Sequence, residues 1–433
     1  MAIATHPEEL EQHGAAGWLT AARQLLTLLV LGLLPLGLGL VVILGSIDHH
    51  FAFDFHSLWE AARDVRSGRN PYPPATVAAL APGEGFVYPP VVAFAALPLG
   101  LLPFGLAAAL MVVSLVGCTA GTLWVLGVRD WRCFGAAYLS IPVLHDLRLG
   151  AISLVLALAV ALAWRWRAHR RAALPIAFAI VAKVFLWPLL VWLVATRRIA
   201  LARQTMLLGL VATGLAWAAI DFAGLTTYPR LLDVLSAVEQ GAGYSPASAV
   251  LALGLGQLAA RVLATAAGLA LLGACVVLGR RGDDRRSLTL ALGASLALSP
   301  IVWLHYFVLL LVPIALARRS LGLIWVVPVL FWLMPYEDQA ASWRVVVGLA
   351  IAALVLGLAL RRLPLERRLV CQVVPVVQED PLEVARDRRV LDDQSRIPVA
   401  QHRVRRPVLA GHERDRAVAD DALVVHALLD PHA

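Results

Sequence analysis

The chain has 433 residues, 60% of them hydrophobic, and a mean hydropathy of +0.76. This composition excludes an ordinary soluble domain and predicts an all-α, polytopic bundle of transmembrane helices. The formal net charge of +8 comes largely from arginines in short loops, which orient a membrane protein in its bilayer and do not indicate a nucleic-acid partner.

The first apolar segment, residues 25–47, contains no charged residue over 23 positions. A helix of this length crosses the ~30 Å hydrocarbon core, and it is too long for the apolar region of a signal peptide. We interpret it as a retained first span that follows a cytoplasmic N-terminal segment, residues 1–24.

Residues 48–87 are predicted to form the first external loop, and this loop contains a short helix. The sequence Ser57-Leu58-Trp59-Glu60 has the pattern of a capping box, which predicts a helix ending near Arg66, before Gly68. Asp54 precedes this helix and would be held at a defined depth at the membrane surface. Its carboxylate is a candidate general base, although its position is equally compatible with a favourable charge at a helix N-terminus.

Tyr72 and Tyr88 each precede two prolines, which predicts two rigid turns that fix the loop against the membrane. Tyr88 is the better candidate for lining a substrate cavity. Farther along the chain, Pro98 and Pro103 indicate a half-span followed by a full span that ends near Arg129.

Five clusters of arginine divide the rest of the hydrophobic body. They lie at 165–171, 197–203, 280–286, 318–319 and 361–368. The positive-inside rule places all five in the cytoplasm, so each apolar segment between two clusters must cross toward the outer side and return. The predicted hairpins are 133–164, 172–196, 287–317 and 321–360, and residues 203–278 cross out and back around an external loop near 224–247.

Several hairpin arms contain only about 12 residues, which as helix extend ~18 Å and do not reach across the hydrocarbon core. Their tips should therefore lie below the outer surface and line a cavity. Counting short and long arms together, we expect roughly 10 to 13 membrane segments.

The hairpin tips carry most of the polar residues of the hydrophobic body. Lys183 is the one lysine among 37 basic residues, which indicates a specific need for a compact ammonium. A lysine that snorkels from a helix end is the alternative. With Arg148 and His305 at two other tips, Lys183 would supply cationic groups that stabilise a departing lipid-linked phosphate while Asp54 accepts a proton from a hydroxyl. Glu337 and Asp338, at a further tip, are expected to form a solvated loop.

Segments along the chain resemble glycosyltransferase family 87, whose members are integral-membrane enzymes of the GT-C class. The resemblance rests on Asp54-Phe55-His56, Gly68 to Tyr72, Phe86 to Pro90, Leu102 to Phe104, Leu147 to Gly150, Ala182 to Pro188 and Leu298 to Tyr306. These segments occur in family order over roughly residues 20–360. The chain departs from many relatives at Ala151, at Gly243-Tyr244 and around His305, positions that bear on sugar and acceptor identity.

The resemblance implies inverting transfer of mannose, with an α-mannoside product, from polyprenyl-phosphate-mannose to a glycolipid or cell-envelope glycan. The reaction is expected at the outer face of the cytoplasmic membrane, and some members use polyprenyl-phosphate-arabinose instead. The residues implied are Asp54 as general base, Lys183, Arg148 and His305 at the donor phosphate, and His56, Tyr88 and Ser299 in the substrate cavity. No cofactor and no metal are expected, and the four cysteines have no metal-ligand spacing. The expected partners are the lipid-linked donor, the acceptor and membrane lipids.

The catalytic domain is expected to comprise residues 25–363. Residues 364–433 contain no Phe, Tyr or Trp and are expected to form a disordered cytoplasmic tail. Two non-catalytic alternatives stay open, namely a transporter of lipid-linked sugars and an assembly subunit. A transporter would show paired halves, whereas the polar residues here gather on one side.

Overall fold

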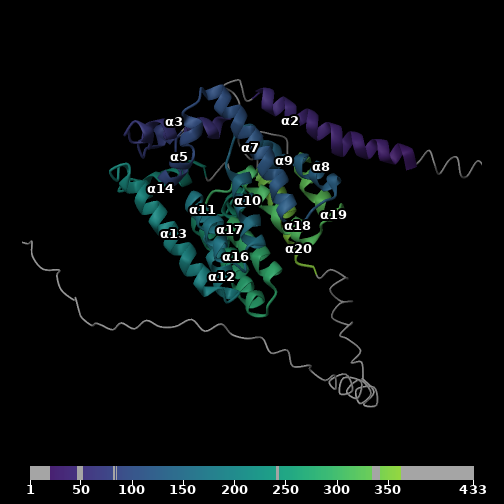
Figure 1. Cartoon of the computed structure of the whole chain (residues 1–433). Helices are drawn as coiled ribbons and strands as arrows, with labels where there is room; N and C mark the ends of the chain where they lie inside the picture. Colours follow the sequence, from purple (N-terminus) through teal and green to yellow (C-terminus); the bar gives the residue numbers. More distant parts are fainter. Residues whose placement is uncertain are drawn as a thin grey trace, which may run out of the picture. The chain divides into compact units, whose positions relative to one another are not determined.

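The computed structural model describes residues 20–45, 52–80, 83, 85–239, 243–333 and 342–361. Within these ranges every regular element is a helix, as the sequence predicted (Figure 1). Residues 1–19, the segment 364–433 and the pair Glu337 and Asp338 lie outside the described residues. The expectations for these segments therefore stay predictions.

In the described part of the chain, four helices are long and apolar enough to cross a membrane: Thr20–Val42, α7 (Phe104–Val125), α13 (Ile199–Ala218) and α16 (Gln257–Arg280). The first of them includes the π-helical turn η1 (Leu29–Leu33) and runs into α2 (Leu34–Gly45). A fifth candidate is the pair α9 (Ile141–Leu149) and α10 (Ser153–Arg165), which are bent by 117° at the break between them. These helices indicate a multi-pass membrane protein.

Most other helices are shorter, because prolines, glycines and polar tips interrupt them. They are α3 (Phe53–Arg66), α4 (Val77–Leu80), α5 (Pro90–Ala95), α6 (Leu97–Gly100), α8 (Trp131–Tyr138), η2 (Arg170–Ala172), α11 (Ala173–Ala182), η3 (Val184–Leu186), α12 (Pro188–Ala195), α14 (Tyr228–Glu239), α15 (Pro246–Ala252), α17 (Asp284–Leu298), η4 (Leu304–Leu310), α18 (Leu311–Ala317), α19 (Leu323–Val326), η5 (Val327–Leu333) and α20 (Ser342–Ala359). The predicted count of roughly 10 to 13 segments is not shown, since it included arms as short as the 10 residues of α11.

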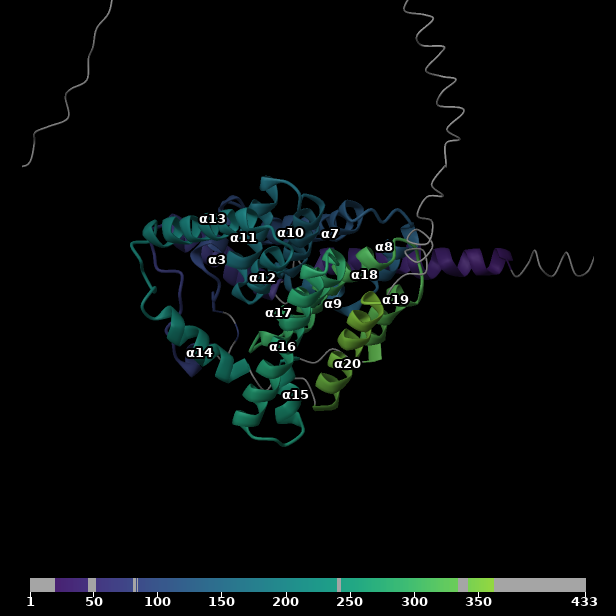
Figure 2. The same ribbon diagram turned by 90° about the horizontal axis from the view of Figure 1, so that it is seen from below.

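The helix α17 lies at the centre of the fold. Its residues from Ser287 to Ala297 are buried on every side of the helix, against α16, α12 and α20 among others. A helix that is covered all round must be apolar or carry small residues, and this one is built from Leu, Ala, Ser, Thr and Gly. Around it, α10 packs on α7 and α11, and α13 packs on α11 (Figures 1 and 2).

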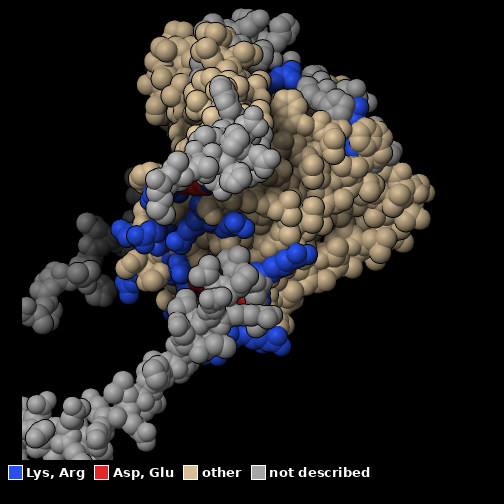
Figure 3. Space-filling view, turned by 90° about the vertical axis from the view of Figure 1, so that its right-hand side faces the viewer, with Lys and Arg blue, Asp and Glu red and all other residues tan. Residues whose placement is uncertain are grey.

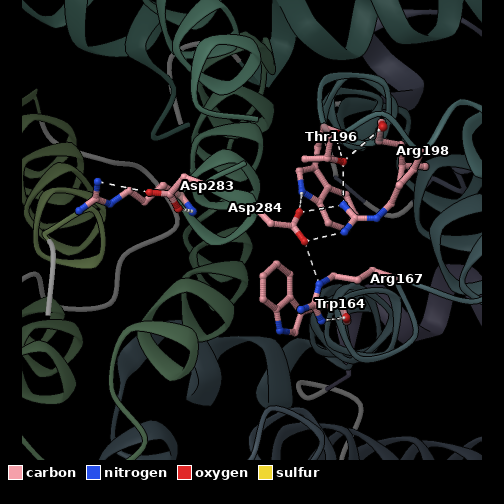
Figure 4. Close-up of polar contacts among 9 residues, drawn as sticks. Trp164, Arg167, Thr196, Arg198, Asp283 and Asp284 are labelled. Carbon is pink, nitrogen blue, oxygen red and sulfur yellow. Dashed lines mark hydrogen bonds and ion pairs between the residues drawn. The ribbon is translucent and has the colours of Figure 1, made fainter. Parts of the chain in front are cut away.

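Arginine-bearing turns meet at the end of the fold where α17 begins. Asp284 accepts hydrogen bonds from Arg198 through both carboxylate oxygens, at 2.9 and 2.8 Å, from Arg167 Nε at 2.8 Å and from Trp192 Nε1 at 2.9 Å (Figure 4). These bonds join the predicted clusters 165–171, 197–203 and 280–286. One face of the molecule shows basic side chains gathered beside a broad surface without charge (Figure 3).

The loop helix α3 begins earlier than the sequence predicted. It starts at Phe53, after Ala52 in the left-handed conformation with φ 59°, and it ends at Arg66 as expected. The predicted capping box is wrong, because the Ser57 hydroxyl donates within the helix to the Asp54 carbonyl at 3.0 Å. Asp54 therefore lies in the first helical turn, where a carboxylate is favoured by the helix dipole.

Candidate functional site

Three hairpin tips and the first loop bring polar side chains to one place. Asp54 comes from α3, Lys183 from the break between α11 and η3, and His305 from η4. The His305 Nε2 atom is 3.9 Å from Asp54 Oδ2, and Lys183 is the cation that acts on the Asp54 carboxylate. Asp146, on α9, adds a second carboxylate that interacts with both Asp54 and Lys183. The cluster is therefore built from four segments that are far apart in the sequence.

The Asp54 carboxylate is deep in the fold and still accessible, with 25% of its side chain exposed. Burial raises the pKa of Asp54 from 3.8 to about 6, and the Lys183 charge opposes part of this rise. Among the described residues, no hydrogen-bond donor to this carboxylate is found, and the 3.9 Å contact between its Oδ2 atom and the His305 Nε2 atom is long. A group of this kind can accept a proton near neutral pH.

Two tyrosines enclose the Lys183 ammonium. Lys183 Nζ lies 4.4 Å from the centre of the Tyr88 ring and 4.6 Å from that of Tyr306, which are cation–π distances. It also donates to the Tyr306 hydroxyl at 2.6 Å. The ring of Tyr306 is stacked on Phe185 with ring centres 4.9 Å apart. The ammonium is thus held in a fixed position, which differs from a lysine that snorkels to the surface.

Hydrogen bonds from two other tyrosines fix the loop that carries Tyr88. The Tyr72 hydroxyl donates to the Tyr88 carbonyl at 3.1 Å, and the Tyr228 hydroxyl donates to the Val87 carbonyl at 3.0 Å. Tyr72 in turn stacks on Trp217 at the end of α13, with ring centres 5.3 Å apart. The two Tyr-Pro-Pro turns are therefore joined by a hydrogen bond, and together they hold the Tyr88 ring against Lys183.

The turn after α9 positions the start of α3. Gly150 has φ +64°, and a Cβ atom at this position would lie 2.7 Å from the Cβ of Phe55. The Ala52 N–H donates to the Arg148 carbonyl at 2.7 Å. Because Ala52 and Phe55 flank Asp54 in α3, the close approach at Gly150 determines where the Asp54 carboxylate lies.

Three of the predicted site residues have other positions. Asp54, Lys183, His305 and Tyr88 come together, whereas the Arg148 carbonyl accepts from the Ala52 N–H and the Arg148 charge acts on His145. His56 lies on another face of α3, with its ring against Phe104 at 5.1 Å. Ser299 is buried, and its hydroxyl donates to the Ile301 carbonyl within the turn after α17.

Two residues of the cluster were not predicted from the sequence. Asp146 is completely buried and accepts a hydrogen bond from the Leu154 N–H at 3.1 Å, and its Oδ1 atom has no hydrogen-bond partner among the described residues. Tyr306 directly follows His305 and bonds to Lys183. A carboxylate within an apolar helix is costly and would have been a sufficient signal for Asp146, whereas no sequence pattern distinguished Tyr306.

Other features of the described residues do not add to this cluster. No group of three or more His, Cys, Asp or Glu side chains is arranged to hold a metal in the part of the chain that the structure describes. A groove of about 510 Å³ shares no lining residue with the Asp54 cluster; it is lined by Thr20, Arg23, Gln24, Thr27, Asp130, Trp131 and Arg132. It joins the start of the first span to α8.

Comparison with known proteins gives one result. The family model of glycosyltransferase family 87 matches residues 86–304, just over half of the 433-residue chain. Tyr88, Asp146 and Lys183 lie inside the matched region, and Asp54 precedes it. No curated protein and no solved structure matches the chain.

Proposed function

The chain belongs to glycosyltransferase family 87, and from this premise we propose that it transfers mannose from polyprenyl-phosphate-mannose to a hydroxyl of a glycolipid or cell-envelope glycan. Family membership makes the protein a glycosyltransferase with a sugar donor and an acceptor. The proposal adds the lipid-linked donor, the sugar and the kind of acceptor. The proposal rests on one observation: the accessible Asp54 carboxylate lies beside the only lysine of the chain.

In the proposed reaction, Asp54 removes the proton of the acceptor hydroxyl as the hydroxyl oxygen attacks the anomeric carbon of the donor sugar. The bond between the anomeric carbon and the phosphate oxygen breaks, and the lipid phosphate departs with the electron pair. Lys183 stabilises the charge that develops on the phosphate. Attack from the opposite face inverts the anomeric centre, so a β-linked mannosyl phosphate gives an α-mannoside.

His305 has a role beside Asp54 in this proposal. Its ring is 3% exposed, and neither ring nitrogen has a hydrogen-bond partner among the described residues. The Nε2 atom faces Asp54 Oδ2, so a shortening of this 3.9 Å contact when substrate binds would orient the base. We therefore propose that His305 orients Asp54 and does not bind the donor phosphate.

The proposed active-site side of the membrane is the outer one. The arginine turns that meet at Asp284 lie where α17 begins, and the Asp54 cluster includes η4, which follows the other end of α17. If the arginine end faces the cytoplasm, as the positive-inside rule requires, Asp54 faces the extracytoplasmic side. A polyprenyl-phosphate sugar on that side can then reach the cluster from the bilayer.

Sugar transfer by the purified protein in liposomes tests the proposal. The donors are polyprenyl-phosphate-mannose and polyprenyl-phosphate-arabinose, each with an envelope-lipid extract as acceptor, and Asp54→Asn is assayed in parallel. Mannose transfer that is lost in Asp54→Asn is the expected result. Transfer of arabinose alone would change the sugar, and donor binding without any transfer would favour a transporter or assembly subunit.

A further inference from the structure

The hydroxyl of Tyr306 accepts its hydrogen bond from the only lysine of the chain. An ammonium has three N–H donors and no acceptor, so in the 2.6 Å contact between Lys183 Nζ and Tyr306 the phenol oxygen must be the acceptor. The phenol proton must then point elsewhere. Among the residues that the structure describes, no acceptor for it is found. The contact thus presents two donors side by side, the ammonium and the phenol O–H.

Packing fixes the position of the Tyr306 ring and of its hydroxyl oxygen. Tyr306 is 6% exposed, and its ring lies almost parallel to that of Phe185, at 12° between the planes. His305 contacts another part of the ring with centres 4.9 Å apart. A hydroxyl that accepts from a cation is polarised and becomes a stronger donor than a free phenol. The fold therefore prepares a strong, neutral donor beside the cation.

The charge balance of the cluster explains why a neutral donor is useful there. Among the described residues, Lys183 is the cation that acts on Asp54, and the carboxyl groups of both Asp54 and Asp146 act in turn on Lys183. A second cation would lower the basicity that Asp54 needs as a proton acceptor. A phenol O–H holds an anionic oxygen without this effect.

We propose that Tyr306 and Lys183 together bind the phosphate of the lipid-linked donor, each to a different non-bridging oxygen. This inference rests on the proposed function and adds a specific phosphate-binding residue to it. Tyr306 takes the place that the sequence suggested for His305. A phosphate suits the pair because its oxygens are close together and can accept from two neighbouring donors at once.

Binding of a sugar-free lipid phosphate tests this inference without turnover. The full-length protein in detergent is titrated with a short-chain polyprenyl phosphate and with the corresponding polyprenol, which lacks the phosphate. Tyr306→Phe is expected to weaken binding of the phosphate about tenfold or more and to leave polyprenol binding unchanged. The matched control is Tyr138→Phe, which removes another tyrosine hydrogen bond, 2.7 Å to the Val116 carbonyl, and is expected to change neither.

Equal phosphate binding by wild type and Tyr306→Phe, with a loss in Lys183→Met, would overturn the inference and leave the proposed function intact. Absence of sugar transfer in liposomes would instead defeat the proposed function, since the binding assay does not depend on it. If Tyr306→Phe does not fold, Tyr306→His keeps a ring and an N–H donor. Phosphate affinity within about threefold of wild type is then expected, and a loss as large as that of Lys183→Met would contradict the assignment.

Discussion

Asp54→Asn should abolish transfer and at the same time stabilise the folded protein. Burial raises the pKa of Asp54 from 3.8 to about 6, a difference of roughly 2 units. At about 1.4 kcal/mol per unit, keeping this carboxylate ionised costs the folded state up to about 3 kcal/mol. Asparagine has nearly the same shape and no charge, so the variant avoids this cost.

The sign of the pH dependence follows from the direction of the shift. Because the folded-state pKa is above the unfolded value, the protonated form is favoured by folding. Protonated Asp54 therefore stabilises the folded protein relative to ionised Asp54. This stabilisation is fully present below about pH 4 and is lost as the pH rises through about 6. Asp54→Asn should therefore gain stability over wild type at pH 8, and the gain should disappear near pH 4.

Thermal unfolding in detergent at pH 4 and pH 8 measures this difference. The matched control is Asp64→Asn, at the other end of α3, where the carboxylate pairs with Arg69 at 2.7 Å on the surface. A midpoint for Asp54→Asn that is a few degrees higher at pH 8, with no gain for Asp64→Asn, is the expected result. A variant that is no more stable than wild type at pH 8 would refute the burial argument.

The same pKa predicts the pH profile of transfer by wild type. The base must be unprotonated to accept the acceptor proton, so the rate should fall about tenfold per pH unit below about pH 6 and level off between about pH 6 and pH 8. Transfer that does not change between pH 5 and pH 8 would argue against Asp54 as the base.

Three further variants test Lys183, the turn that positions Asp54, and the arginine-bearing end of the fold. Lys183→Arg should lose turnover about tenfold or more in liposomes, because a longer side chain with a planar, delocalised charge does not reproduce the point charge that donates to Tyr306 at 2.6 Å. Near-normal turnover would count against a specific phosphate contact. Gly150→Ala, whose Cβ would meet Phe55, should lower turnover about tenfold or more. Its control is Gly68→Ala, which also has a positive φ (+69°) but open space around it, and which should cost only about 1 kcal/mol of stability. Asp284→Asn should lower the free energy of unfolding by about 3 kcal/mol and leave the donor KM unchanged, and an unchanged melting temperature would contradict its structural role.

The arrangement of the hairpins was largely predictable from arginines and apolar lengths. The loops around Arg167, Arg198 and Asp284 do meet, and Lys183 and His305 do lie at tips that come together. The start of α3 was not predictable in the same way. The helix begins after Ala52, which is in the left-handed conformation and donates its N–H to the Arg148 carbonyl of a segment that is distant in the sequence.

The candidate site could be predicted where a residue type is rare in the sequence. It could not be predicted where it depends on the direction in which a side chain points. Lys183 was conspicuous as the only lysine, and Asp54 as a carboxylate close to a span. On α9, however, residues two positions apart point to different faces, so the sequence could not show which side chains of this helix face the cluster. That outcome depends on how α9 packs, which in turn depends on the bend of 117° before α10.

The hydrogen bonds of three aspartates distinguish the proposed catalytic carboxylate from two structural ones. Arg132 donates to both oxygens of Asp130 at 2.9 Å, the Leu321 N–H adds a third bond, and these bonds hold the pKa of Asp130 at about 2. Asp284 is satisfied in the same manner by two arginines and an indole N–H. Asp54 instead has a long contact to His305 and a raised pKa. A carboxylate whose hydrogen bonds are complete cannot accept a proton from a substrate at neutral pH, so of these three only Asp54 can act as the base.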